Sequence, residues 1–251
     1  MEPALHTPLY MDWSFWAVAV AAIAVILSQL PPIHLLVRRA RIDIEPYSRI
    51  HITHKIGNPN VQFHLIVTNI GGRNVKIKNL TVRIKRDGAD VTTLPAVNYL
   101  QNPGDKTNVL FTSFSLKPKE EWSHIVNFLN YFSRIEEKKY KIAEAALRKD
   151  ILEKRNLLEN KDQVVAANND FVAPFIEMFN SKFIWTPGEY EVAIFVSASN
   201  KKANIEKRYR FTLFESDSNE LSESKNAFEF GDGINWDSGN YTGVIVQIVE
   251  A

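Results

Sequence analysis

The segment RIHITHKIGNPNVQFHLIVTNIGGRNVKIKNLTVRIKRDG, residues 49 to 88, decides the fold of this chain. Apolar and polar residues alternate at 49–54 and at 75–86, and the run VQFHLIVTN at 61–69 is rich in β-forming residues. Turn residues separate these runs: KIGNPN at 55–60, GGR at 71–73 and Asp87-Gly88 after the last one. The segment therefore predicts three consecutive strands.

Further strands are expected on both sides of this segment. RIDIE at 41–45 precedes it, weaker runs follow at 91–97 and 109–116, and three late runs lie at 185–199, 205–215 and 242–250. The first two late runs form a predicted hairpin around Asn200 to Asn204. Short strands separated by turns at intervals of about 10 residues indicate an immunoglobulin-like antiparallel β-sandwich.

A helical insertion interrupts the predicted strands. The apolar residues Trp122, Ile125, Val126, Leu129 and Phe132 recur at helical spacing. SRIEEKKYKIAEAALRKDILEKRNLLENKD at 133–162 continues as helix, and NDFVAPFIEMFNSKF at 169–183 predicts another. The acidic, serine-rich stretch at 215–223 is expected to be an exposed loop.

The soluble part is thus predicted to be one mainly β domain, residues 38–251, with a helical insertion at about 119–182. Two separately folding domains are the alternative. In the long helix the apolar stripe is narrow, which suits a helix that lies on the sandwich or pairs with one partner helix. Its residues are Ile135, Ile142, Ala146, Ile151 and Leu158.

The N-terminal run WSFWAVAVAAIAVILSQLPPIHLLVRR, residues 13–39, predicts a single transmembrane helix. Roughly 18 to 25 residues lack a charge, and about 20 apolar residues cross a bilayer core. Trp13 and Trp16 suit an interfacial aromatic belt, while Pro31 and Pro32 end or kink the helix. We expect residues 13–37 to form this helix and an interfacial collar. A cleaved signal peptide lacks its basic start here, and a buried core helix lacks a polar face.

Flanking charge predicts the orientation. The tail at 1–12 holds acidic residues and no Lys or Arg, whereas Arg38, Arg39 and Arg41 follow the apolar run. The positive-inside rule places the tail outside the cytoplasm and the β domain within it. We expect a single-pass protein of the cell membrane, in bacteria the inner membrane, with the three arginines at the lipid headgroups.

Composition excludes several classes of function. The 251 residues contain 30 basic and 29 acidic side chains, so no overall positive field would recruit nucleic acid. There is no cysteine, which excludes disulfides, thiolate zinc sites and a cysteine nucleophile. Phosphate-binding glycine loops, the GxSxG elbow and HExxH are absent from the sequence. We therefore expect neither catalysis nor a cofactor.

Four other patterns have both a functional and a structural interpretation. His51 and His64 could face each other across a hairpin and share a metal, but no third ligand follows, and His54 would point to the opposite face. FGDGINWDSGNY at 230–241 could bind calcium or a sugar, although such residues are ordinary in turns. A basic strand could contact a polyanion or anionic lipid, or be a solvated face; it contains Lys76, Lys78, Arg83, Lys85 and Arg86.

The fourth pattern is an aromatic stripe in the second predicted helix. It is a candidate partner-binding face, with packing against the sandwich as the alternative. Its residues are Phe171, Phe175, Met178, Phe179 and Phe183. Together these observations predict a membrane-anchored, non-catalytic module that binds or scaffolds an unknown protein partner. A sensor domain that binds a small molecule or ion is the alternative, and self-association into a homo-oligomer is left open.

Overall fold

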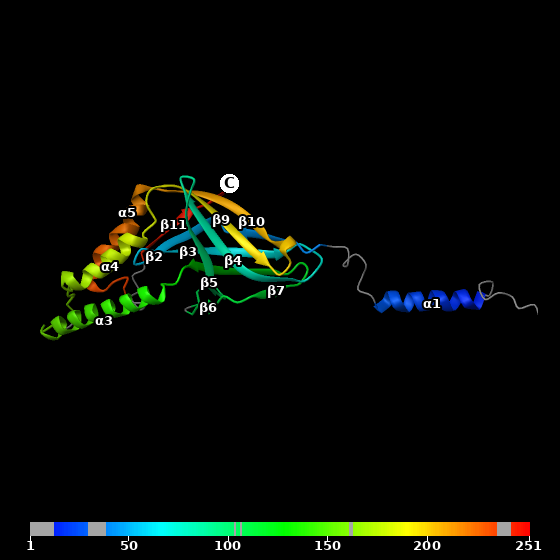
Figure 1. Cartoon of the computed structure of the whole chain (residues 1–251), viewed down its shortest axis with the longest axis horizontal. Coiled ribbons are helices and arrows are strands. Elements are labelled where there is room, and N and C mark those ends of the chain that lie inside the picture. The colour runs from blue at the N-terminus through cyan, green and yellow to red at the C-terminus, as the bar shows by residue number, and fades with distance from the viewer. Residues whose placement is uncertain (1–12, 30–38, 103, 106, 161–162, 235–241) are drawn as a thin grey trace, which may run out of the picture.

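The computed structural model describes residues 13–29, 39–102, 104–105, 107–160, 163–234 and 242–251. One antiparallel sheet dominates, and helices gather at one of its ends (Figure 1). The strands in the first half are β1 (Ile42–Pro46), β2 (Arg49–Lys55), β3 (Asn58–Asn69), β4 (Val75–Arg86), β5 (Ala89–Leu100) and β6 (Val109–Leu110). Those that follow are β7 (Phe114–Leu116), β8 (Glu121–Leu129), β9 (Gly188–Ala198), β10 (Ile205–Leu213), β11 (Gly243–Gln247) and β12 (Val249–Glu250).

The pairing links all twelve strands into one sheet. Its order is β11-β2-β3-β8-β5-β4-β9-β10-β12, with β1 beside β3, β6 beside β5 and β7 beside β4. The sheet curls until β10 contacts β1 and β11, which leaves it nearly closed and barrel-like. The prediction of a mainly β, antiparallel fold is confirmed, whereas the two separate layers of a sandwich are not distinguished by this pairing.

The core lies inside the curled sheet and follows the alternation of the sequence. On β3 every second side chain is fully buried, namely Val61, Phe63, Leu65 and Val67. The predicted hairpin of β9 and β10 is present, and the short 3-10 helix η2 (Lys201–Ala203) connects its strands. Trp185, buried between the sheet and the helices, donates from its ring nitrogen to the Thr53 carbonyl at 3.0 Å.

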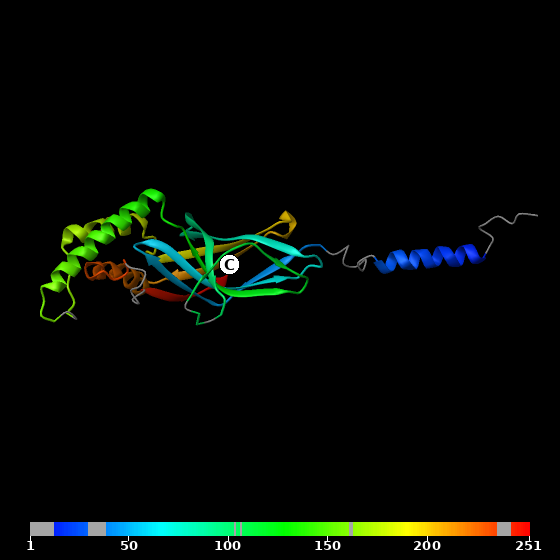
Figure 2. The ribbon, with the colours of Figure 1, turned by 90° about the horizontal axis from the view of Figure 1, so that it is seen from below.

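The helices at one end of the sheet are α3 (Arg134–Asn156), α4 (Asn169–Lys182), α5 (Glu215–Glu223) and the 3-10 helix η3 (Ser224–Phe230). We call these four elements the helical tip. A capping box starts α3, because Ser133 accepts from the Glu136 amide and the Glu136 carboxylate accepts from the Ser133 amide. Figure 2 shows the helices of the tip together at one end of the sheet.

Two local predictions were wrong. Residues 121–129 form strand β8 between β3 and β5, so the helical part begins at Arg134 and not near 119. Residues 215–223 form α5 and not an exposed loop, since Leu221 and Ser218 are buried. Pro174 lies in the second turn of α4.

The N-terminal helix α1 (Trp13–Gln29) has 17 residues and is exposed along almost all of its described length. Within the part of the chain that the structure describes, no helix combines the length and the apolarity needed to span a membrane. The predicted tail at 1–12 and the predicted collar, with Pro31, Pro32 and Arg38, lie outside the described residues.

The opposite end of the sheet receives the chain after α1, and we call it the linker end. It consists of residues 39–41 and three loops. The loop at 70–74 follows β3, the loop at 117–120 follows β7, and the loop at 199–204 follows β9. In Figures 1 and 2, α1 lies beyond this end and the helical tip lies at the other.

Candidate functional site: the helical tip and its junction with the sheet

The aromatic stripe of α4 lies in the core of the helical tip. Phe175 and Phe179 are buried against Tyr140, Leu147 and Phe228. Phe171, Met178 and Phe183 are partly buried against the same cluster. The stripe is therefore covered mainly by α3 and η3 of this chain, whereas the predicted alternative was packing against the sandwich.

His54 joins the tip to the sheet. Its Nδ1 accepts from the Gly57 amide at 3.1 Å, so its Nε2 carries the hydrogen and donates to the Leu221 carbonyl at 2.9 Å. The rings of Phe179 and Phe183 contact it edge-on, with centroids 5.2 and 5.5 Å away. Burial lowers the pKa of His54 below its ordinary value. This histidine is a structural connection between β2, α4 and α5.

The register of the β2–β3 hairpin does not produce the predicted pairing of His51 with His64. A two-residue turn at Ile56-Gly57, both with positive φ, pairs His51 with Gln62 and not with His64. His51 packs against Gly243 of β11, and His64 lies 3.0 Å from the Ser123 hydroxyl. The described residues contain no group of three His, Asp or Glu side chains that could hold a metal ion.

A cavity of about 280 Å³ lies where the β2–β3 hairpin meets α3. It forms where the tight turn ends the hairpin and where four residues connect the end of β8 to the start of α3. Its walls are Thr53, His54, Lys55, Asn58, Asn60, Leu129, Asn130, Tyr131, Phe132, Glu137, Tyr140, Lys141 and Glu144. Its volume is just below the roughly 300–1,000 Å³ of typical ligand pockets, so any ligand that it holds would be small.

Lys55 is one of four charged side chains in the wall of this cavity, with Glu137, Lys141 and Glu144. Its ammonium lies 4.5 Å from the centre of the Tyr140 ring, a cation–π contact. Burial lowers the pKa of Lys55 from its ordinary 10.5 to about 8, and the Glu144 and Glu137 carboxylates oppose this shift. The Tyr140 hydroxyl donates to the Ile234 carbonyl, which holds the ring in place.

Asparagine side chains supply the neutral polar groups. Asn58 donates from its amide to the Asn130 carbonyl at 2.7 Å. The Asn60 side-chain oxygen is buried and accepts no hydrogen bond from the described residues. A ligand in the cavity would therefore meet a cationic donor in Lys55 and an acceptor in Asn60, because buried acceptors are normally hydrogen-bonded.

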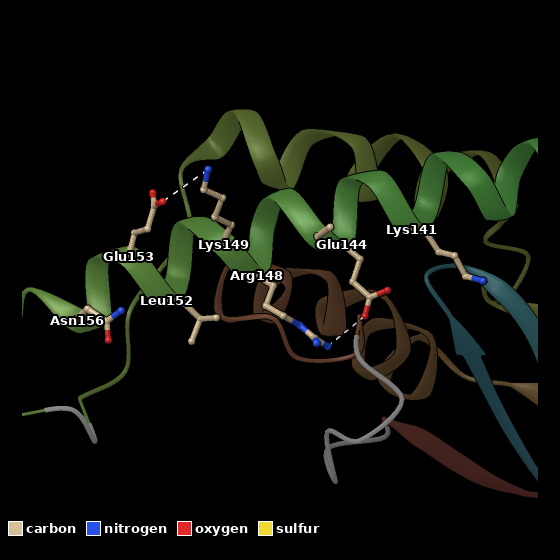
Figure 3. Close-up of a pocket in the computed structure, with 8 residues that line it drawn as sticks. Lys141, Glu144, Arg148, Lys149, Leu152, Glu153 and Asn156 are labelled. Carbon is tan, nitrogen blue, oxygen red and sulfur yellow. Dashed lines mark hydrogen bonds and ion pairs between the residues drawn. The ribbon is translucent and has the colours of Figure 1, made fainter.

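A second hollow, of about 530 Å³ and open to solvent, runs along the outer face of α3 (Figure 3). Two ion pairs border it: Glu144 with Arg148 at 3.4 Å, and Lys149 with Glu153 at 3.7 Å. Leu152 lies between them and is 47 % exposed. This face combines an exposed apolar side chain with charges of both signs.

The predicted apolar stripe of α3 is split between two faces. Ile151 is buried in the tip with Tyr140 and Leu147, whereas Ile135 and Ile142 are 71 % and 62 % exposed. The helix packs through a line of residues rotated from the predicted stripe, because Tyr140 and Leu147 supply the buried contacts. Ile142 and Leu152 therefore remain on the solvent side.

The remaining candidates lie elsewhere. Trp13 and Trp16 are exposed on α1, and Arg39 and Arg41 are exposed at the linker end. On β4, Lys85 and Arg86 pair with Asp90 and Asp87, which reduces the charge of the basic strand. Of the predicted calcium or sugar loop, residues 235–241 lie outside the described residues.

Sequence reasoning missed the cavity. The charged and amide residues that line it come from three separate segments, at 53–60, 129–132 and 137–144, and only the turn at Ile56-Gly57 and the start of α3 bring them together. The one sign of the cavity in the sequence was Lys55 at the turn cluster 55–60, and a lysine at such a position is common in exposed hairpins. No protein-family model matches this chain, and no curated protein is similar to it in sequence.

Proposed function

We propose that this chain is a single-pass membrane protein whose β domain carries the helical tip as a non-catalytic binding module for another protein. The observation that carries the proposal is the position of the two helical parts: the apolar α1 and the helical tip lie at opposite ends of the sheet. Such an arrangement would hold the tip away from the bilayer.

The composition and exposure of α1 support the anchor. Its residues carry no charge, and Trp13, Phe15 and Trp16 are 88 %, 44 % and 54 % exposed. Its 17 residues, at about 1.5 Å each, extend about 26 Å, which is about 4 Å short of a bilayer core of about 30 Å. Arg39 and Arg41 follow it, so the positive-inside rule favours a cytoplasmic β domain, in bacteria at the inner membrane.

The path of β5 supports the finer description of the sheet as an immunoglobulin-like sandwich. Residues 89–95 of β5 pair with β4, and residues 96–100 pair with β8. A strand that changes partner in this way joins two layers at one edge. We propose that the sheet consists of two layers that β5 connects.

The outer face of α3 is the proposed contact surface. Exposed apolar side chains at Ile142 and Leu152 lie among charged residues, a pattern that suits an amphipathic helix of the partner. Deleting α3 would not test this idea, because Tyr140, Leu147 and Ile151 belong to the core of the tip. Substitutions of exposed residues preserve that core and give a sharper test.

A photo-crosslinking amino acid at Leu152 tests the proposal in native membranes. We expect one defined adduct, whose yield falls about tenfold when Ile142→Asp is added. The same amino acid at Arg83, exposed on β4 of the sheet and outside the tip, is the control and should yield no such adduct. Adducts of two copies of this chain would identify a homo-oligomer, and equal labelling from both positions would contradict the proposal.

The cavity at Lys55 favours a second candidate, a membrane-anchored sensor of a small molecule. Its buried acceptor at Asn60 and its partly buried ammonium are the convergent polar groups that such a site needs. Native mass spectrometry of the chain purified from its own membranes should then show a bound small molecule that Lys55→Met loses. An adduct retained by Lys55→Met, or none in the parent chain, would count against the sensor.

A further inference from the structure

The loops of the linker end are strongly basic in a chain of almost balanced charge. The loops at 70–74, 117–120 and 199–204 contain five basic residues and one acidic residue, Glu120, whereas the whole chain has 30 basic and 29 acidic residues. We call these five residues the basic rim: Arg73, Lys117, Lys119, Lys201 and Lys202.

Asn69 brings two of these loops together. Its backbone and side chain are fully buried. The side-chain amide donates to the carbonyls of Arg73 at 2.8 Å and Leu116 at 3.0 Å. The Lys119 amide in turn donates to the Asn69 carbonyl at 2.8 Å. The loop that holds Arg73 and the loop that holds Lys117 and Lys119 are therefore joined through one residue.

The third loop, at 199–204, lies beside the start of β4, as the end of β7 does. The Ser199 amide donates to the Lys76 carbonyl at 2.8 Å, one residue past the start of β4, and Val75 pairs with Leu116 of β7. Lys201 and Lys202 follow on η2, which an Asn200 side chain caps. All three basic loops thus meet near the start of β4, at one end of the sheet.

The rim presents its charge to solvent. All five side chains are exposed. None of the ion pairs formed within the described part of the chain involves Lys117, Lys119, Lys201 or Lys202. The Glu120 carboxylate instead accepts from the Lys117 backbone amide at 2.6 Å. The positive charge of these four lysines is therefore not neutralised by an ion pair within the described residues.

The rim also surrounds the point where the chain arrives from α1. The Gly71 amide donates to the Arg41 carbonyl at 2.9 Å, and the Gly72 amide donates to the Arg39 carbonyl at 3.3 Å. A side chain at Gly71 would collide with both residues, because its Cβ would lie 2.5 Å from the Arg39 carbonyl oxygen. The basic rim is thus continuous with the juxtamembrane arginines.

We infer that the basic rim rests on a bilayer surface that contains anionic lipid, and that this contact holds the β domain upright with the helical tip directed away from the membrane. The inference rests on the proposed function, since it takes α1 as the anchor. Each basic residue near an anionic surface strengthens the attraction about fivefold, and added salt screens it. Five such residues around one attachment point would orient the domain as well as attract it.

The lack of cysteine allows a direct test on the full chain. A fluorophore is attached at Asn74→Cys beside the rim, or at Asn156→Cys on the tip as the control, and both positions are exposed. The labelled chain is incorporated into nanodiscs of phosphatidylcholine, with or without phosphatidylserine, that carry headgroup nitroxide quenchers. We expect quenching at Asn74→Cys to increase several-fold with phosphatidylserine and to decrease in high salt, and Asn156→Cys to stay unquenched.

A pair of double variants connects the result to the rim. Lys201→Gln with Lys202→Gln should remove most of the phosphatidylserine-dependent quenching at Asn74→Cys. Lys141→Gln with Lys149→Gln removes the same charge from the tip and should leave the quenching unchanged. Quenching that is equal in both lipids, or unaffected by the rim variant, would overturn the inference about the rim. The proposed anchor would still be supported if the chain remained stably incorporated in the nanodiscs.

The remaining outcomes separate the anchor from the rim. A chain that associates only with phosphatidylserine nanodiscs and is released by salt supports the rim and contradicts the anchor. A chain that associates with neither nanodisc contradicts both.

Discussion

The two ends of the sheet are closed by different physical means. At the helical tip, aromatic side chains such as Phe175, Phe179 and Phe228 cover the open end of the sheet with an apolar cluster. At the linker end, the polar side chain of Asn69 connects backbone groups of the loop at 70–74 with the end of β7. The helices α3, α4 and α5 lie at the first end, so apolar closure occurs where helices can shield it from water.

The two ends therefore differ both in what stabilises them and in the charge that they expose. The tip obtains its stability from buried area, and its exposed face on α3 pairs charges of opposite sign. The linker end obtains its stability from hydrogen bonds to loop backbones, which leaves the lysine side chains of those loops directed to solvent. A loop that is held through its backbone can present any side chain, and here the side chains are basic.

Phe179→Ala should break the tip with the largest effect. The side chain is 2 % exposed and contacts the rings of His54, Phe183 and Phe228. Truncating a buried phenylalanine costs about 3–5 kcal/mol. Urea unfolding should show this loss, and hydrogen exchange should increase in α3 and α4 before it increases in β4. Phe230→Ala, at an exposed phenylalanine of η3, is the control and should change stability by less than about 0.5 kcal/mol.

Asn69→Leu should break the linker end. Leucine is similar in size, but it leaves the Gly71 amide and the carbonyls of Arg73 and Leu116 without their partner. Three lost hydrogen bonds at about 1 kcal/mol each predict a loss of about 3 kcal/mol in urea unfolding. Asn74→Leu, at an exposed position of the same loop, should be nearly neutral. Equal stability of both variants would show that Asn69 does not hold the loops.

Two glycines sharpen the comparison, because each end has one in close contact with backbone. A Cβ at Gly57 would lie 2.5 Å from the Phe179 carbonyl oxygen, and one at Gly71 would lie 2.5 Å from the Arg39 carbonyl oxygen. Gly57→Ala should cost about 2 kcal/mol, since α4 is held by the core of the tip. Gly71→Ala should cost about 1 kcal/mol or less, because residues 39–41 precede the first strand and can move aside.

The backbone contribution at Gly57 needs its own control. Gly57 has φ +77°, and Gly88 has φ +83° with no atom within 4 Å of an added Cβ. Gly88→Ala therefore measures the cost of a left-handed alanine alone, about 1 kcal/mol. Thermal unfolding of the three alanine variants should rank them Gly57, then Gly88 and Gly71. If Gly71→Ala were the least stable, the linker end would be the more rigid of the two.

Glu136→Gln should have the smallest effect. The Glu136 carboxylate lies 2.7 Å from the Lys182 ammonium and so connects α3 to α4, and glutamine preserves the capping box. An exposed ion pair contributes at most about 1 kcal/mol. The hydrogen bond from Lys182 lowers the pKa of Glu136 from 4.5 to about 2.

The pH dependence of this pair follows from the sign of the shift. Since the folded chain holds the proton less tightly than the unfolded chain, the stabilisation is complete above about pH 4.5 and disappears as the pH falls towards about 2. The stability difference between the parent chain and Glu136→Gln should shrink over that range. A constant difference would show that the pair is not what glutamine removes.

Most strands could be predicted from alternation, and the exceptions have a common cause. In β8, Trp122 and Val126 lie on one face while Ile125 and Leu129 lie on the other, which imitates helical spacing. Apolar residues on both faces of a central strand erase the period of two. In α5, the acidic residues of the first turn were a helix signal that we interpreted as loop polarity.

The candidate site was less predictable than the fold. The α4 stripe was visible in the sequence, but whether it faces a partner or its own core depends on where α3 and η3 pack. Lys55 and Asn60 lie at the cavity because the turn between β2 and β3 has two residues, whereas the predicted turn had six, 55–60. A register difference of two residues preserves the faces of a strand while it changes every cross-strand neighbour.

The sequence by itself determined the local preferences: the β alternation, the helices at 134–156 and 169–182, the apolar α1 and the arginines that follow it. These depend on the order of neighbouring residues, which the chain carries in any conformation. Only the tertiary structure decided which faces are covered, how the Lys55 cavity is closed, and that three distant loops unite in one basic rim. Those features depend on contacts between segments far apart in the chain, and such contacts exist only after the sheet has curled and the helices have packed against its end.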